Sequence, residues 1–182
     1  MKNILITGGT RGLGLEYARH LSERGYNVGL TDISENACKV YDEVNSTEEI
    51  LSEIQAYGGK TWLEFADLTK KEEAKKLVKK FINYYGNIDG VVTSAGGDIS
   101  GDDPDASGGK AKNNSFFISF NDHENIFQRN YYTCLNTLRA VVPYMQKQKS
   151  GKIITVSSVN AAFGVEKETT YSVAKSSIVQ LT

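Results

Sequence analysis

A tyrosine and a lysine near the end of the chain have the types and spacing needed to move a proton. Tyr171 and Lys175 are four residues apart, which places their side chains on one face of a helix. A free phenol titrates near about pH 10 and is a poor base, but a nearby cation favours the phenolate and lowers its pKa. The pair therefore suits general acid-base catalysis near neutral pH.

A serine completes this candidate catalytic group. Ser158 lies thirteen residues before Tyr171, directly after an expected strand, where its hydroxyl can hold a substrate oxygen. A proton donor and such a hydroxyl, beside a hydride-carrying cofactor, are the parts that carbonyl reduction needs. Each feature alone also has an ordinary explanation, as surface neighbours or as turn residues after a strand. The catalytic interpretation therefore depends on a cofactor site elsewhere in the chain.

A glycine-rich turn near the N-terminus predicts that cofactor site. The run Thr7-Gly8-Gly9-Thr10-Arg11-Gly12-Leu13-Gly14 stands between an apolar strand and an amphipathic helix. Glycines there allow a tight turn and close backbone approach to a pyrophosphate, whose charge the helix N-terminus stabilises. A glycine turn without a ligand is the alternative, but the position between a strand and a helix favours dinucleotide binding.

An acidic residue after the second expected strand indicates which dinucleotide is bound. Asp32 follows Gly14 by eighteen residues, where a carboxylate accepts hydrogen bonds from the adenosine ribose hydroxyls. The same carboxylate repels the 2′-phosphate of NADP, whereas Arg11 favours that phosphate. Because repulsion between like charges at contact distance is hard to relieve, we expect NAD rather than NADP.

Short apolar strands alternate with amphipathic helices along the chain. Strands are expected over residues 3–7, 27–31, 61–66, 88–93 and 153–157. Helices are expected over residues 11–24, 47–57, 69–85, 121–148 and from 170 onward. This order predicts an α/β fold, a doubly wound parallel sheet in three αβα layers, forming a single Rossmann-type domain over residues 1–182. Its ligand should lie beyond the carboxyl ends of the strands.

Three helices carry more specific expectations. Leu13, Tyr17 and Leu21 should form the apolar face of the first helix, and Thr69 with Glu72 should form a capping box on the third. Pro143 should bend or interrupt the long helix.

Composition excludes several classes of protein. The 182 residues carry a formal net charge of −1, which favours neither a nucleic-acid nor an anionic-membrane partner. The two cysteines form no disulfide framework, no Cys/His cluster has zinc spacing, and no apolar run has transmembrane length. We therefore expect a cytoplasmic protein without a bound metal.

The segment 97–114 is rich in Gly, Asp, Ser and Asn and follows the fourth expected strand. Its position at the ligand edge suggests an active-site lid, with a surface insertion as the alternative. Asp103 begins a pattern like that of a calcium loop, but Asn114 stands where the bidentate Glu is needed, so calcium is disfavoured.

Taken together and in order, these motifs resemble the short-chain dehydrogenase/reductase family of the classical type. Further matches are Asp67-Leu68 after the third strand, Ala95-Gly96 after the fourth, where Ser94 replaces an Asn of the family, and Asn130 on the long helix. The resemblance implies that Tyr171 is the acid/base. Lys175 tunes it and holds the nicotinamide ribose, Ser158 orients the substrate oxygen, and Asn130 supports a proton-relaying water. The implied cofactor contacts are Gly8, Thr10, Arg11, Gly12, Leu13, Gly14, Asp32, Asp67, Leu68, Ala95, Gly96, Tyr171 and Lys175.

The resemblance predicts an oxidoreductase that transfers a hydride between NAD(P) and a small alcohol or carbonyl compound, such as a sugar-derived polyol or a 3-oxoacyl compound. It also implies a homodimer or homotetramer that uses the long helix and the Tyr171 helix. The main alternative is an inactive nucleotide-binding or scaffold protein, disfavoured by the intact Ser158, Tyr171 and Lys175. A sugar epimerase, which usually has different glycine spacing and a longer substrate domain, ranks last.

The resemblance also implies more chain than is present. Family members continue after the Tyr171 helix with two more strands and a helical segment that covers the substrate, whereas this sequence stops at Thr182. We expect a missing C-terminal tail, with a deliberate cut or a natural truncation as alternatives.

Overall fold

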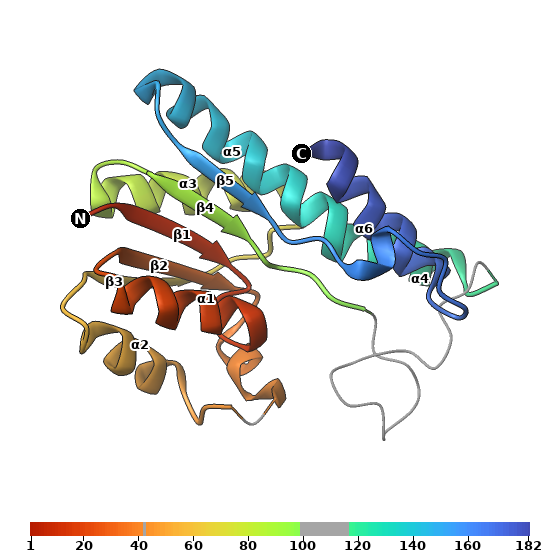
Figure 1. Ribbon diagram of the computed structural model, residues 1–182, viewed down its shortest axis with the longest axis horizontal. Coiled ribbons are helices and arrows are strands. Elements are labelled where there is room, and N and C mark those ends of the chain that lie inside the picture. Colours follow the sequence, from red (N-terminus) through yellow and green to blue (C-terminus); the bar gives the residue numbers. More distant parts are fainter. Residues whose placement is uncertain (42, 99–116) are drawn as a thin grey trace.

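The computed structural model describes residues 1–41, 43–98 and 117–182. Within them, a sheet of five parallel strands has the order β3-β2-β1-β4-β5. The strands are β1 (Asn3–Thr7), β2 (Asn27–Asp32), β3 (Thr61–Phe65), β4 (Gly90–Thr93) and β5 (Lys152–Thr155). Helices cover both faces of this sheet (Figure 1), so the predicted three-layer, doubly wound α/β fold is confirmed.

The two helical layers are made from different parts of the chain. One layer consists of α1 (Gly12–Glu23) and α2 (Thr47–Gln55), and the other of α3 (Lys71–Tyr85) and α5 (Thr133–Gln148) (Figure 1). The last helix, α6 (Thr169–Leu181), packs against α4 (Phe120–Phe127) and the π-helical turn η3 (Gln128–Tyr132). Short 3-10 segments, η1 (Glu35–Tyr41) and η4 (Val159–Ala161), follow β2 and β5.

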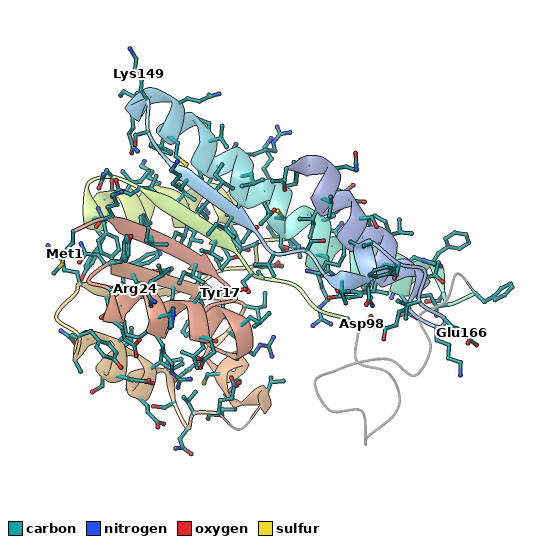
Figure 2. All side chains as sticks on the ribbon, in the orientation of Figure 1. Met1, Tyr17, Arg24, Asp98, Lys149 and Glu166 are labelled. Carbon is teal, nitrogen blue, oxygen red and sulfur yellow. The ribbon has the colours of Figure 1, made fainter. Side chains whose placement is uncertain are left out.

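The alternation of side chains along β1 builds a separate core on each face of the sheet. Ile4 and Ile6 pack with Leu15 of α1 and Ile50 of α2, whereas Leu5 packs on the opposite face. There it joins apolar side chains of α3 and α5, among them Leu77, Phe81, Val141 and Met145. Side chains from both layers fill the space against the sheet (Figure 2), which holds the strand ends rigidly in place.

The direction of the strand order reverses at β1. Thr7, its last residue, pairs with Thr31 of β2 on one side and with Thr93 of β4 on the other. In open α/β sheets the ligand crevice lies outside the carboxyl ends of the strands at such a reversal. The glycine turn that follows Thr7 is therefore at the expected position of a ligand site.

The apolar face predicted for α1 is partly wrong. Leu13 is 61% exposed, and the side chains buried against the sheet are Leu15 and Ala18, together with Ser22. Tyr17 and Leu21 pack only at the margin of this core. The cause is the glycine turn: the helix begins at Gly12, and its first turn faces the ligand crevice rather than the sheet.

The capping box predicted for the third helix is also wrong, and Pro143 does not interrupt the long helix. Helix α3 begins at Lys71 without a side-chain cap, because the Thr69 hydroxyl donates instead to Asp67 Oδ1 at 2.6 Å. The long helix changes from α-helical to π-helical geometry at η3, whereas α5 continues through Pro143.

The lid and calcium hypotheses for residues 97–114 lie outside the described residues, except for Gly97 and Asp98. In the part of the chain that the structure describes, no helix has the length and apolar content needed to span a bilayer.

Candidate active site

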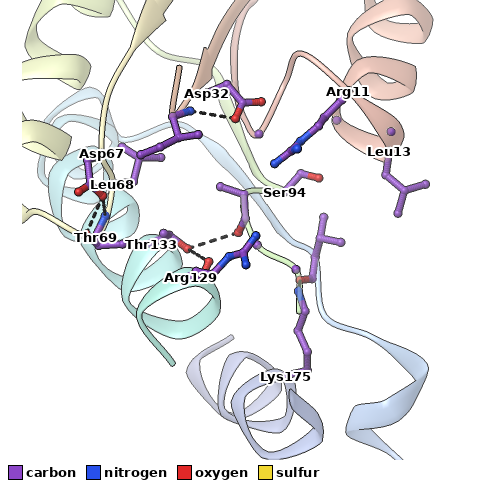
Figure 3. A pocket seen from close by; sticks show the side chains of 18 of the residues that line it. Arg11, Leu13, Asp32, Asp67, Leu68, Thr69, Ser94, Arg129, Thr133 and Lys175 are labelled. Atoms are coloured by element: carbon purple, nitrogen blue, oxygen red, sulfur yellow. Dashed lines mark hydrogen bonds between the residues drawn. The ribbon is translucent and has the colours of Figure 1, made fainter. Parts of the chain in front are cut away.

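A pocket of about 470 Å³ opens at the carboxyl ends of the strands (Figure 3). Its volume is in the range of small-molecule sites. The predicted site residues that line it are Gly8, Arg11, Gly12, Leu13, Gly14, Asp32, Asp67, Leu68, Ala95, Gly96, Tyr171 and Lys175. Figure 3 shows Asp32 and Lys175 at opposite ends, so the pocket runs from the glycine turn to the candidate catalytic pair.

The glycine turn makes close main-chain contacts that no larger residue could make. A Cβ atom on Gly14 would lie 1.9 Å from the carbonyl oxygen of Gly8, and one on Gly8 would lie 2.8 Å from Cα of Ala95. Gly8 and Gly12 also have positive φ angles of 63° and 50°, which L side chains rarely adopt. The turn therefore keeps a backbone-lined cradle at the start of α1, which fits the close approach of a pyrophosphate.

Thr10 is the one predicted residue of this turn that lies outside the pocket lining. It is fully buried, and its backbone N–H and its hydroxyl donate to Asp32 Oδ2 at 3.3 and 2.7 Å. The other oxygen, Oδ1, accepts from the Ile33 N–H at 2.9 Å. Thr10 thus fixes the orientation of the Asp32 carboxylate at the edge of the pocket.

The wall next to β3 is held from the opposite layer. Asn136 of α5 donates to the carbonyl oxygens of Leu68 and Thr69, at 3.0 Å each. Asp67 accepts from both the N–H and the hydroxyl of Thr69, which keeps the turn after β3 compact. Nothing in the local spacing singled out Asn136, because its partners lie more than sixty residues away in the chain.

Asn130 is completely buried and lies behind the pocket wall. Its Nδ2 donates to the carbonyl oxygens of Gly97 and Ile126 at 2.8 Å each, and its Oδ1 accepts from the Gly97 N–H at 3.0 Å. The side chain thereby holds the segment that follows β4 against η3. Single π turns of this kind are frequent at functional sites. Beside it, Arg129 lines the pocket, although no sequence pattern pointed to it.

Lys175 is a buried cation at the far end of the pocket. Only 4% of the residue is exposed, and Nζ donates to the carbonyl oxygen of Val156 at 3.0 Å. Nζ also lies 5.7 Å from the centre of the Tyr171 ring. Burial lowers the pKa of Lys175 to about 8, so the ammonium is the main form at neutral pH. The spacing of four residues on α6 thus brings a phenol and a cation together at one end of the pocket.

The two neighbouring serines have different positions. Ser157 lines the pocket, and its hydroxyl donates to the carbonyl oxygen of Lys175 at 2.8 Å, which ties the end of β5 to α6. Ser158, the predicted catalytic serine, lies outside the lining and caps η4 by accepting from the Asn160 N–H at 3.3 Å. No sequence pattern pointed to a site role for Ser157.

Comparison with known proteins places this chain in a family. The model of the short chain dehydrogenases matches residues 2–182. The chain belongs to the short-chain dehydrogenase family. It is 28% identical over 181 residues to a 3-oxoacyl-(acyl-carrier-protein) reductase, FabG, of Staphylococcus epidermidis, covering 100% of this chain and 66% of that relative. The chain thus spans about two thirds of the length of the curated relatives that it matches.

Solved structures show the same fold. An NAD⁺-bound xylitol dehydrogenase superimposes with a TM-score of 0.82 at 22% identity, covering 100% of this chain and 62% of that one. A 7α-hydroxysteroid dehydrogenase complexed with NADH and 7-oxo glycochenodeoxycholic acid gives 0.81 at 25% identity, covering 99% and 62%. The short-chain dehydrogenase fold is therefore shared over nearly the whole of this chain.

Proposed function

We propose that the protein is an NAD-dependent oxidoreductase that transfers a hydride between nicotinamide and a small alcohol or carbonyl substrate. One observation carries this proposal: Tyr171 and Lys175 of α6 line the same pocket as the glycine turn and Asp32. A structural surface pair would not need to share a ligand-sized pocket with a dinucleotide turn.

The two ends of the pocket would contact different parts of the cofactor. The turn at Gly8, Gly12 and Gly14 would hold the pyrophosphate, with Arg11 and Leu13 beside it, and Asp32 would accept from the adenosine ribose hydroxyls. Asp67, Leu68, Ala95 and Gly96 would line the adenosine side, while Tyr171 and Lys175 would face the nicotinamide ribose. The fixed carboxylate of Asp32 supports NAD over NADP.

Proton transfer would fall to the residues of α6. When bound, the cofactor supplies or accepts the hydride at the substrate carbon. Tyr171 would donate the proton to the substrate oxygen, and the Lys175 ammonium would favour the phenolate that remains. Ser158 would orient the substrate oxygen after a rotamer change that releases its contact with Asn160. Asn130 would support a proton-carrying water through the chain segment that it clamps.

The substrate class is proposed from the relatives. The names of similar proteins include a 3-oxoacyl-(acyl-carrier-protein) reductase and a xylitol dehydrogenase, whose substrates are a 3-oxo ketone and a polyol respectively. We therefore propose a sugar-derived polyol or a 3-oxoacyl compound as the substrate.

A homodimer or homotetramer through α5 and α6 is supported by exposed apolar side chains on these helices, such as Tyr144 and Val173. Sedimentation equilibrium tests this, since a monomer at all concentrations would contradict it.

Replacement of Tyr171 by Phe tests the proposed chemistry. The variant keeps the ring beside Lys175 but loses the transferable proton, so kcat should fall by about 10³-fold while the Kd for NADH changes less than about twofold. Turnover is measured with NADH and with NAD⁺ against panels of ketones and polyols. If the wild-type protein binds NADH but turns over none of them, and the variant behaves identically, the inactive nucleotide-binding alternative is supported instead.

A further inference from the structure

A carboxylate that no sequence motif identified lies at the start of α1. Glu43, between η1 and α2, accepts a hydrogen bond from the backbone N–H of Gly12 at 2.6 Å. Gly12 is the first residue of α1 and lines the pocket, whereas the Glu43 side chain itself is exposed. A side chain from 31 residues further along the chain thus reaches back to the glycine turn.

The Gly12 N–H that bonds Glu43 belongs to the class of helix N-terminal amides that bind phosphate groups. The first N–H groups of a helix have no partner within the helix, and the helix dipole favours a negative charge there. The first turn of α1 contains no acidic residue of its own, so Glu43 supplies that charge from outside the helix. The Glu43 carboxylate thus accepts a hydrogen bond from the first amide of a helix whose first residue lines the pocket.

Glu43 and Asp32 both accept hydrogen bonds from the glycine turn. Thr10, two residues before Gly12, donates to Asp32 through both its N–H and its hydroxyl. Two carboxylates therefore accept hydrogen bonds from this turn: Asp32, which is fixed and 7% exposed, and Glu43, which is exposed. Arg11, between Thr10 and Gly12 in sequence, is a cation at this same turn.

We propose that Glu43 is a specificity-determining residue that discriminates against a 2′-phosphorylated dinucleotide. Its carboxylate adds a negative charge to the turn that carries Arg11, and it thereby offsets the attraction of Arg11 for a 2′-phosphate on the adenosine ribose. NAD carries no phosphate at this position and meets no such repulsion. The inference rests on the proposed function, because it needs the pocket to bind a nicotinamide dinucleotide with its adenosine end at Asp32.

The test compares Glu43→Gln with a matched control, Glu35→Gln. Both side chains are exposed, both belong to the segment after β2, and both changes remove one negative charge, but no contact links Glu35 to Gly12 among the described residues. Dissociation constants for NADH and NADPH are measured by isothermal titration calorimetry at fixed salt. Glu43→Gln should lower the Kd for NADPH by about tenfold and that for NADH by less than about twofold. Glu35→Gln should leave both constants near those of the wild type.

The outcomes separate this inference from the proposed function. If the wild type binds NADH and Glu43→Gln leaves the ratio of the two Kd values unchanged, the role of Glu43 is refuted and the proposed function stands. An equal shift in Glu35→Gln would also refute it, because the effect would then be one of overall charge. If neither the wild type nor Glu43→Gln binds NADH or NADPH, the proposed function fails and the inference fails with it.

Discussion

The two ends of the pocket, called the adenosine end and the catalytic end after the roles proposed for them, are built in different ways. The adenosine end depends on main-chain geometry: Gly8 and Gly14 lie too close to their neighbours for a side chain, and they follow β1, which is buried along its whole length. The catalytic end depends on side-chain charge, in Tyr171 and Lys175 on α6, and lies beside β5, where Ile154 is 58% exposed. Substitutions that add atoms should therefore have their largest effect at the adenosine end, and substitutions that alter charge should have theirs at the catalytic end.

The largest effect is expected at the adenosine end from Gly14→Ala. The new Cβ would lie 1.9 Å from the Gly8 carbonyl oxygen, so α1 must move away from the turn. Stability should fall by about 3 kcal/mol, measured by denaturant unfolding, and NADH binding should be lost. Gly164→Ala is the control, because no atom lies within 4 Å of its Cβ position. Similar results for the two variants would contradict the steric account of this end.

At the catalytic end, Lys175→Met should change how the free energy of unfolding depends on pH, because it removes a buried charge. Burial lowers the pKa of Lys175 from 10.5 to about 8, so the wild type buries a full charge at pH 7 at a cost on the order of 3 kcal/mol. Between pH 8 and 10.5 only the unfolded chain keeps that proton, and the contribution of Lys175 to stability therefore rises with pH.

Lys175→Met should accordingly be more stable than the wild type at pH 7, and this advantage should disappear as the pH approaches 10.5. The measurement is urea unfolding from pH 6.5 to 10.5. Lys76→Met, on the exposed face of α3, serves as the control. A stability difference between Lys175→Met and wild type that does not depend on pH would show that the lysine is not a desolvated cation.

A smaller effect is expected from Thr10→Val. The change removes the 2.7 Å hydrogen bond to Asp32 but keeps the shape of the side chain, so the carboxylate loses part of its fixed orientation. NADH affinity should fall about fivefold, which corresponds to about 1 kcal/mol. Thr10→Ser, which keeps the hydroxyl, should bind NADH nearly as the wild type does. Equal NADH affinities of the Val and Ser variants would contradict the positioning role of Thr10.

The fold and the local motif at each end of the pocket were the more predictable features. The strand and helix periodicities, the glycine turn and the four-residue spacing of Tyr171 and Lys175 are local patterns, and local patterns are visible in a sequence. The features that were predicted wrongly or missed depend on partners far away in the chain, or on which of two nearby groups forms the hydrogen bond. Thr69 bonds Asp67 rather than capping α3. Asn136 and Glu43 act on turns far away in the chain. No spacing rule covers such contacts.

The central claim is that one pocket binds a nicotinamide dinucleotide between the glycine turn and α6. Calorimetric titration of the wild-type protein and of Gly14→Ala with NADH tests it most directly. The account predicts saturable binding of one NADH per chain to the wild type and none to the variant. Absence of NADH binding to the correctly folded wild type, or equal binding by both proteins, would contradict it.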